Sequence, residues 1–508
     1  MEDKMLVGID FGTCNIKVSK WNNKKGTAIP VKLEKNQNLA DAITPNVILY
    51  KEKEPVIGFT AQNTNEHEEN QVVYIKRKLE TENWVQYIPN LGKEVGAITV
   101  AKDIFTKVKA IVCEQNGGDM PDEVVITTPV CYSEMQKARI LKAATEAGFN
   151  VSEVITEPLA AIFSIEDYFE DEEVEENIIV FDFGGGTLDL SLFSIENDGE
   201  NNMTLKVLAS NGLKYGGVDI TEAIYNQIIV PNCKHILESL SEEDAKDSKA
   251  EIFKLVEDLK QELFIDDEDE VETFKILRDG SKVELSLSRQ QVYDILEQHE
   301  LKSRIYDLMD QLIEDARLDK EDITKVKLVG GTSRIDYFQE LLYSYFDEND
   351  DILDLDDLDS DETYRAVADG SVRYLSFITE EESTLSFQNK IAFSVGTEYQ
   401  GKFDPCITKN AKYGYISPKR PLDLSAYKER KAAFKVYQLF NKKRNIAITD
   451  EEVIYIGCFE IDKSKYQAST ISYEMQISKQ GEILGRFYDM DEDSTPILIQ
   501  EEKIKIEV

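Results

Sequence analysis

Two stretches of the chain place an aspartate, glycines and a threonine directly after an apolar run. Residues 178–195 read IIVFDFGGGTLDLSLFSI, where Asp182 ends a strand pattern and is followed by Gly184, Gly185, Gly186 and Thr187. Residues 6–21 read LVGIDFGTCNIKVSKW, where Asp10 is followed by Gly12, Thr13, Cys14 and Asn15. Glycine leaves backbone N–H groups uncovered, and consecutive free N–H groups bind phosphate oxygens. Because Mg²⁺ keeps several waters and takes few protein carboxylates, Asp10 and Asp182 are candidate metal ligands.

Two further glycine pairs precede predicted helices. In VKLVGGTSRIDYFQELL (326–342) a strand leads into Gly330 and Gly331, and a helix is predicted from about Ser333. In KYGGVDITEAI (214–224) Gly216 and Gly217 precede a second helix. A helix N-terminus next to bare backbone attracts anions, so the element at 326–342 favours a nucleoside and its α-phosphate, and the element at 214–224 has the same join of glycines to a helix start. A tight strand-to-helix turn without a ligand is the alternative interpretation.

The elements that carry these residues indicate an α/β domain built by duplication. Short apolar strands are predicted at 6–10, 124–127, 178–182 and 326–329, and helices at 102–115, 133–147, 252–263 and 289–316. The stretches around Asp10 and Asp182 share one plan of strand, small-residue turn and second strand. A duplicated domain with both copies facing one cleft explains that repeat.

The pattern changes after about residue 383. Helical periodicity ends, and strands are predicted at 432–440, 453–461, 469–478, 483–489 and 497–508, with a hairpin turn at 479–481. We therefore expect three parts: an α/β nucleotide domain over 1–379, a linker over 380–390 and a β-sandwich over 391–508.

The composition limits the possible partners and the compartment. The 508 residues carry a formal net charge of −40, which argues against nucleic acid and an anionic membrane surface as partners. The six cysteines form no CxxC pair, which favours a reducing compartment, and no apolar run is long enough to span a membrane. The cytoplasm is the predicted location. Acidic stretches at 166–176, 241–247 and 347–362 are predicted to be solvated loops or helix faces.

Four motifs in order resemble the seventy-kilodalton heat-shock chaperone family. IDFGTCN and VFDFGGGTLDLS resemble its two phosphate hairpins, LVGGTSRI resembles its adenosine element, and residues 124–164 resemble the segment between the hairpins. The resemblance implies an actin-like, ribonuclease H-like nucleotide domain of two lobes. It also implies a C-terminal β-sandwich that binds peptide.

The resemblance also implies roles for individual residues. Lys76, in YIKRKL, and Glu157, in ITEPLAA, correspond to the lysine and carboxylate around the γ-phosphate and the attacking water. Asp182 and Thr187 complete the implied catalytic set, and Glu257, Lys260, Gly331 and Arg334 are implied to border the adenosine. Taken alone, Lys76 could be a surface lysine, and Glu157 a helix-start acid before Pro158.

The chain departs from the family pattern in the nucleotide domain and in the linker. Cys14 replaces a threonine, Gln261 and Phe264 replace an arginine and a serine near the base, and Glu153 and Leu159 replace residues that contact the J-domain cochaperone. The linker has only Leu385 and Phe387 as large apolar side chains.

The β-domain departs as well. The chain ends at Val508, where the family's helical lid begins, so we expect a β-domain without a lid. The residues predicted to line the peptide site, each of which could equally be core, are Thr397, Gln400, Leu424, Tyr437 and Leu439.

The sequence therefore predicts an ATP-dependent chaperone and slow ATP hydrolase that uses ATP and Mg²⁺ in protein folding and the stress response. Its predicted partners are extended peptide segments, with a J-domain cochaperone and a nucleotide exchange factor as candidates. A small-molecule kinase of the same superfamily is one alternative. A nucleotide-gated scaffold or filament is the other.

Overall fold

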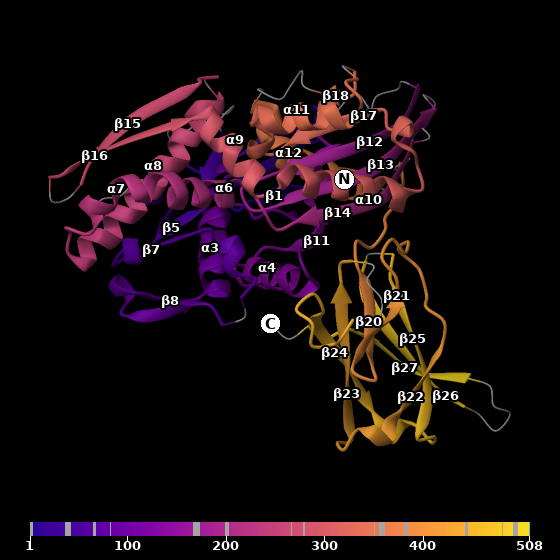
Figure 1. Cartoon of the computed structure of the whole chain (residues 1–508). Coiled ribbons are helices and arrows are strands. Elements are labelled where there is room, and N and C mark those ends of the chain that lie inside the picture. The colour runs from indigo at the N-terminus through magenta and orange to yellow at the C-terminus, as the bar shows by residue number, and fades with distance from the viewer. Residues whose placement is uncertain are drawn as a thin grey trace.

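The computed structural model describes residues 4–35, 42–63, 68–81, 83–165, 173–198, 203–265, 267–277, 280–349, 351–354, 361–379, 385–441, 446–479, 481–490 and 496–506. An α/β part of two lobes comes first, and a separate β-sandwich follows (Figure 1). Lobe I is defined here as the described residues up to 165, and lobe II as those from 173 to 354. Helix α12 (Asp361–Thr379) lies between the α/β part and the sandwich in sequence.

Lobe I is built on a mixed sheet in the order β11-β10-β1-β2-β3, with β4 paired to β2. Its strands are β1 (Leu6–Phe11), β2 (Asn15–Asn22), β3 (Thr27–Pro30), β4 (Ile43–Pro45), β10 (Glu123–Thr128) and β11 (Val151–Thr156). Helices α3 (Ala97–Gln115) and α4 (Glu134–Glu146) bury one apolar stripe each in the lobe I core. Helix α4 begins with a reciprocal capping box between Ser133 and Gln136.

Lobe II repeats this plan. Its sheet has the order β18-β17-β12-β13-β14-β19, with β12 (Glu173–Phe183), β13 (Leu188–Asp198), β14 (Met203–Leu213), β17 (Lys325–Val329) and β18 (Leu353–Asp354). In each lobe an antiparallel hairpin, β1–β2 or β12–β13, has a parallel neighbour, β10 or β17. Asp10 and Asp182 occupy corresponding places in the two hairpins, so the predicted duplication is confirmed.

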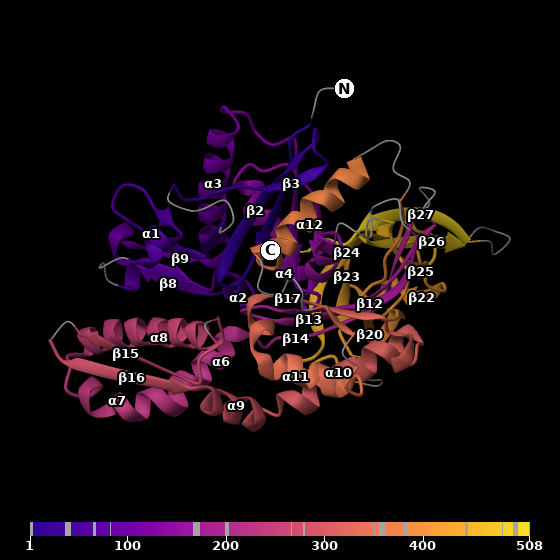
Figure 2. The same ribbon diagram turned by 90° about the horizontal axis from the view of Figure 1, so that it is seen from above.

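Two helices cross between the lobes. Helix α5 (Glu157–Ile162) packs against α12, and α12 also lies on β1 and β2 of lobe I (Figure 2). The crossing is close because Gly370 has no side chain: a Cβ there would overlap the carbonyl oxygen of Ala160. Alanine at this position would therefore force the helices and the lobes apart.

Further helices and strands complete each lobe. Lobe I adds β5 (Val47–Leu49), β6 (Val56–Ile57), β7 (Gln71–Val73), β8 (Val85–Ile88), β9 (Lys93–Gly96), α1 (Phe59–Gln62) and α2 (Ile75–Lys78). Lobe II adds α6 (Gly217–Ile224), α7 (Val230–Leu237), α8 (Glu242–Ile265), β15 (Glu270–Ile276), β16 (Lys282–Ser288), α9 (Arg289–Gln298), α10 (Leu301–Ala316) and α11 (Asp336–Tyr345). Figure 2 shows β8 and β9 of lobe I facing α8 and β15 of lobe II, whereas α10 and α11 lie on the side of lobe II away from lobe I.

Two helix predictions in lobe II were wrong in detail. The helix predicted over 289–316 is two helices, because Glu300 adopts a left-handed conformation (φ 53°) that ends the α-helical path. The helix predicted from Ser333 begins at Asp336 instead, after a 3₁₀ turn over Gly331–Arg334. That turn keeps Arg334 outside the helix.

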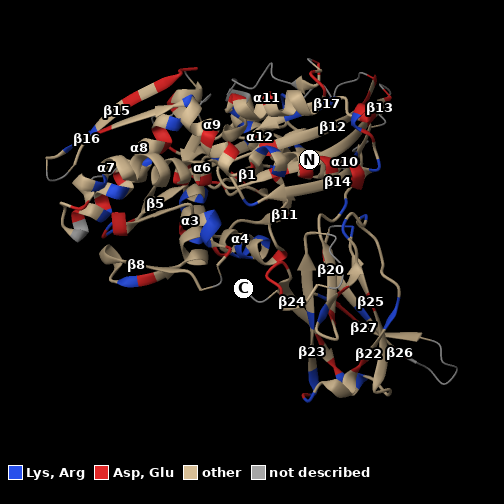
Figure 3. Cartoon of the chain, viewed as in Figure 1, with Lys and Arg blue, Asp and Glu red and all other residues tan. Residues whose placement is uncertain are grey.

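The acidic stretches are only partly described. Residues 241–247 enter α8, a helix face as predicted, but the Asp247 side chain is buried there. Residues 166–172 and 355–360 lie outside the described residues. Elsewhere, acidic side chains lie at the start of β15, where Glu270 and Glu272 are exposed (Figure 3). Exposed acidic side chains repel phosphate-rich polymers from the surface.

The C-terminal part packs two four-stranded sheets face to face. One has the order β21-β20-β23-β24 and the other β22-β25-β26-β27, around an apolar core of its own. The strands are β20 (Ser394–Tyr399), β21 (Lys402–Ile407), β22 (Arg420–Asp423), β23 (Lys431–Leu439), β24 (Ile454–Asp462), β25 (Thr470–Ile477), β26 (Ile483–Met490) and β27 (Pro496–Lys503). The predicted hairpin turn joins β25 to β26, with Gly481 at φ 81°.

The linker joins the sheet of lobe II. Strand β19 (Leu385–Gln388) pairs in parallel with β14, and the Phe387 ring packs against Tyr374 of α12 at 6.1 Å between ring centroids. Residues 380–384 of the predicted linker lie outside the described residues. Two apolar side chains are thus enough to dock this segment on the nucleotide domain.

The sandwich contacts both lobes. The Lys137 ammonium of lobe I lies 5.5 Å from the Phe393 ring centroid. Asp315 at the end of α10 and Lys409 form an ion pair at 3.7 Å, with both side chains at most 3% exposed. Both charges are buried, so separating the sandwich from lobe II would expose the two side chains to water. The Asp315–Lys409 ion pair therefore depends on the position of lobe II relative to the sandwich.

Candidate nucleotide-binding site

A cleft of about 1470 Å³ runs between the lobes. The residues predicted to hold the phosphates, the metal and the attacking water all line it, with the exception of Gly216, which lies behind the second phosphate turn. The predicted residues in the cleft are Asp10, Gly12, Thr13, Cys14, Asn15, Lys76, Glu157, Asp182, Gly184, Gly185, Gly186, Thr187, Gly217, Glu257, Lys260, Gly330, Gly331 and Arg334. Folding therefore gathers residues from seven segments that are separate in the sequence.

The two glycine turns touch across this cleft. A Cβ on Gly185 would overlap the Cys14 thiol, and one on Gly186 would overlap the Thr13 hydroxyl. Behind them, a Cβ on Gly216 would lie 2.5 Å from the backbone of the Gly185–Gly186 peptide. Bare backbone from both lobes thus forms a cradle in which backbone N–H groups can approach phosphate oxygens, although the Gly184 N–H already donates to Thr187 O at 3.0 Å.

Two carboxylates flank the cradle. Asp10 and Asp182 are each 4% exposed, and the Lys17 ammonium donates a hydrogen bond to Asp10 at 2.8 Å. Burial and the nearby Glu157 carboxylate raise the pKa of Asp182 well above its usual range. Within the described ranges no cluster of three or more acidic, histidine or cysteine side chains could hold a metal ion. Two carboxylates with room for water match the donor set of Mg²⁺, which needs few protein ligands.

Lys76 and Glu157 form an ion pair in the cleft. Lys76 comes from α2 of lobe I and is 1% exposed, and its ammonium donates a hydrogen bond to Glu157 at the start of α5. Burial raises the pKa of Glu157, although the Lys76 charge opposes that shift. Lys76 is therefore no surface lysine. Glu157 does begin a helix before Pro158, and the same position brings its carboxylate into the cleft.

The predicted adenosine residues form their own network on α8. The Lys260 ammonium donates to Gly217 O at 2.8 Å, to the Thr221 hydroxyl at 2.7 Å and to Glu257 at 2.9 Å. An ammonium has three donors, so these contacts already occupy all of them. Lys260 thus anchors α8 to the glycine turn that starts α6.

Arg334 belongs to a different segment of the same region. It extends from the 3₁₀ turn, stacks its guanidinium 5.0 Å from the Tyr364 ring centroid and donates to the Tyr364 hydroxyl. Thr332 in the same turn donates to Gly184 O at 2.9 Å, which ties this element to the second phosphate turn.

Comparison with known proteins agrees with this geometry. A family model described as Hsp70 protein matches residues 6–481. The chain belongs to the Hsp70 family. A heat shock cognate HSP70 protein of Trypanosoma brucei brucei is 25% identical over 513 residues, which cover 94% of this chain and 72% of that protein. Chaperone protein DnaK of Thermoplasma volcanium is 27% identical over 347 residues, which cover 67% of this chain and 54% of that protein.

Family membership confirms the actin-like, two-lobed fold expected from the motifs. The described residues agree with it, because the two sheets repeat one topology around a shared cleft. The names of both relatives support an ATP-dependent chaperone function for this Hsp70 chain. No helix of the described residues is long and apolar enough to cross a membrane.

Sequence reasoning missed three charged residues in and around this Hsp70 cleft; of the three, Lys17 lines the cleft, and Arg77 and Asp189 lie behind its walls. Lys17 pairs with Asp10, as described above. Arg77, next to Lys76, forms an ion pair with Asp219 of α6 and so links the two lobes. Asp189 is fully buried and accepts a hydrogen bond from Val130 N at 2.7 Å. Lys17 and Asp189 could have been found in the sequence, because each is a charged residue inside an apolar strand pattern.

Cys14 is suited to packing and not to redox chemistry. Burial and the Glu257 charge raise the pKa of its thiol to about 12. The thiolate is the reactive form, so at pH 8 we expect Cys14 in the native protein to react with iodoacetamide about a thousandfold more slowly than free cysteine. Peptide mass mapping after timed alkylation measures this rate, with Cys113, which is also partly exposed, as the internal reference. Equal labelling of both residues contradicts the assignment.

The residues predicted for the peptide site do not form one open groove. Thr397, Leu424 and Leu439 are each at most 4% exposed, which corrects any role that needs them open to solvent. Thr397 lies 3.4 Å from the Tyr473 hydroxyl inside the sandwich. Tyr437 is half-buried beside Leu439, and Gln400 is exposed in the turn between β20 and β21. The strand register decides whether a side chain points between the two sheets or out to solvent, and the sequence alone does not give that register.

The two positions that the family resemblance associates with a cochaperone, Glu153 and Leu159, are both removed from full exposure. Leu159 is 2% exposed within α5. Glu153 accepts a hydrogen bond from the Tyr374 hydroxyl at 2.6 Å, and burial raises its pKa. Both side chains therefore contribute to the packing of α5 and α12.

Proposed function

We propose that this Hsp70 chain hydrolyses ATP slowly and uses the nucleotide to control how its β-domain holds extended peptide segments. The observation that carries the proposal is the meeting of the Gly12–Cys14 and Gly184–Gly186 turns, each next to a buried aspartate, in one cleft. Such a cradle fits a triphosphate better than a substrate without phosphates.

In this proposal the chain's own groups divide the work between binding and hydrolysis. The glycine turns orient the phosphates through backbone N–H groups, with the Thr13 and Thr187 hydroxyls beside them. Asp10 and Asp182 hold Mg²⁺ with its waters; when bound, the ion neutralises charge on the β- and γ-phosphates. Lys76 adds positive charge near the γ-phosphate, and Glu157 orients the attacking water.

Coupling to the β-domain uses the docked linker. Strand β19 extends the lobe II sheet, so a movement of that lobe shifts a segment that leads directly into β20. The buried Asp315–Lys409 pair provides a second contact that depends on lobe position. We propose domain boundaries at 379 and 391, a cytoplasmic location, and a J-domain cochaperone and an exchange factor as regulators.

Replacement of Phe387 by aspartate should uncouple the two domains. The charge would have to be buried against Tyr374, which disfavours the docked strand. We expect ATP hydrolysis to persist while the acceleration of peptide release by ATP is lost. The matched control is Ser386→Asp, because Ser386 is the exposed position of the same strand. Stopped-flow fluorescence of a labelled peptide measures both variants, and equal behaviour of the two would contradict the coupling route.

The proposal as a whole is tested by two measurements on the full chain. Phosphate release from ATP distinguishes a hydrolase from a kinase, since a kinase transfers labelled phosphate to an acceptor. Labelled-peptide release with and without ATP tests the chaperone function. The proposal would be overturned if the unmodified chain did not bind ATP, or if it released the labelled peptide at the same rate with and without ATP.

A further inference from the structure

One wall of the cleft contains an aromatic side chain, Phe264, on the same helix as Glu257 and Lys260, which the family resemblance implies to border the adenosine. Phe264 lines the cleft from the last turn of α8 and is half-buried against the lobe II core. The Arg289 guanidinium lies over its ring, with 5.2 Å between the guanidinium carbon and the ring centroid. A cation over one face of a ring fixes the orientation of that ring, most strongly where water is excluded.

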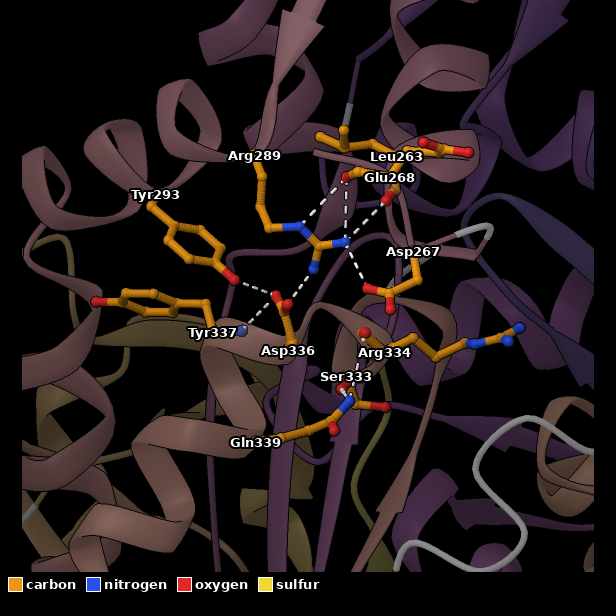
Figure 4. A network of polar contacts seen from close by, with 10 residues as sticks. All are labelled: Leu263, Asp267, Glu268, Arg289, Tyr293, Ser333, Arg334, Asp336, Tyr337 and Gln339. Carbon is orange, nitrogen blue, oxygen red and sulfur yellow. Dashed lines mark hydrogen bonds and ion pairs between the residues drawn. The ribbon is translucent and has the colours of Figure 1, made fainter. Parts of the chain in front are cut away.

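Arg289 is held in place by several acceptors. Figure 4 shows its guanidinium between Asp336, Asp267 and the backbone carbonyls of Leu263 and Glu268. It forms an ion pair with Asp336, donates to Asp267 at 2.8 Å and to Glu268 O at 3.1 Å, and its side chain is only 15% exposed. Asp336 is itself fixed by hydrogen bonds from the Tyr293 hydroxyl and from Tyr337 N. The network therefore positions Arg289, and Arg289 positions the Phe264 ring.

The polar side chains near Phe264 either have their donors in use within the protein or can bond to more than one kind of base. Lys260 has all three donors in use, and Arg334 is held on Tyr364. Gln261, exposed at the cleft, donates one amide N–H to Glu257 at 2.9 Å. Its amide retains a second N–H and the carbonyl, so it can meet either a 6-amino or a 6-oxo group of a purine.

We propose that Phe264 is the residue on which the nucleobase stacks, and that this site accepts purine nucleoside triphosphates with little discrimination between adenine and guanine. The inference rests on the proposed nucleotide function and adds its base selectivity. Stacking on an aromatic ring tolerates different bases because every base has a π-face. Strong discrimination needs fixed polar groups that a wrong base leaves unpaired, and Gln261 is not such a group.

The test compares three ligands on the full chain by calorimetry, each with Mg²⁺: ATP, GTP and inorganic tripolyphosphate. In the unmodified protein we expect ATP and GTP affinities within about tenfold of each other. Phe264→Ser should weaken both nucleotides by about tenfold or more and leave tripolyphosphate binding unchanged. Phe264→Tyr, which keeps the ring, should recover most of the ATP and GTP affinity that Phe264→Ser loses.

Arg289 is tested as a positioning residue by a double-mutant cycle. Arg289→Met should weaken ATP and GTP but not tripolyphosphate, and it should have no further effect in a Phe264→Leu background. Unchanged nucleotide binding by Phe264→Ser, or a preference for ATP over GTP above about tenfold, overturns the inference. Failure of the unmodified chain to bind tripolyphosphate and ATP would instead reject the nucleotide function itself.

Discussion

Replacement of Lys76 by alanine is expected to lower the single-turnover rate of ATP hydrolysis by about a hundredfold or more while ATP affinity changes little. The Lys76 ammonium lies in the cleft, 1% exposed, and contacts Glu157. A fixed positive charge next to a transferred phosphoryl group acts mainly on the transition state, and removal of one such group has effects of about this size. Rapid-quench measurement of phosphate with enzyme in excess over ATP gives the rate directly.

Two further variants make the Lys76 result interpretable. Lys78→Ala changes a lysine of the same helix that is half-buried and does not line the cleft, and should leave the rate unchanged. Because Lys76→Ala leaves the Glu157 charge buried without its partner, the double change Lys76→Met and Glu157→Gln restores a neutral pair. If the double variant folds normally and still hydrolyses ATP at the original rate, the catalytic assignment of both residues is wrong.

Replacement of Gly216 by alanine is expected to weaken ATP binding at least about tenfold and to lower the melting temperature by several degrees. The new methyl group would lie 2.5 Å from the Gly185–Gly186 peptide, so backbone of the phosphate cradle must move. Neither glycine backbone can yield by a side-chain rotation, and a shift of about an ångström would misplace the N–H groups that are proposed to bind phosphate. Titration of a fluorescent ATP analogue and a thermal melt measure the two effects.

Gly96→Ala is the matched control for Gly216→Ala. Both glycines are N-cap residues, Gly96 of α3 and Gly216 of α6. A Cβ on Gly96 would approach nothing closer than Trp84 O at 3.8 Å, so only the small N-cap difference between glycine and alanine remains. Equal ATP affinities of the two variants would show that the contact behind the cradle does not control the phosphate site.

The residues proposed to hold the phosphates and the metal could be singled out in the sequence because their signal is local. A strand that ends in aspartate and continues into glycines describes the Asp10 and Asp182 hairpins before any packing is known. The pairing of β1 with β2 and of β12 with β13 follows from the same short segments. Lys76 and Glu157 depended on resemblance, since a lysine in a basic triplet and an acid at a helix start carry no chemical signal alone.

The sequence by itself determined the hairpins, the duplicated α/β plan and the change to an all-β segment, because strand alternation and turn chemistry are properties of neighbouring residues. Only the tertiary structure decided that Thr397 and Leu424 are buried. It also decided that all three donors of the Lys260 ammonium are hydrogen-bonded, and that the Arg289 guanidinium lies over the Phe264 ring. These facts depend on contacts between segments far apart in the chain. Burial and hydrogen-bond saturation arise only when those segments pack together, so no local pattern encodes them.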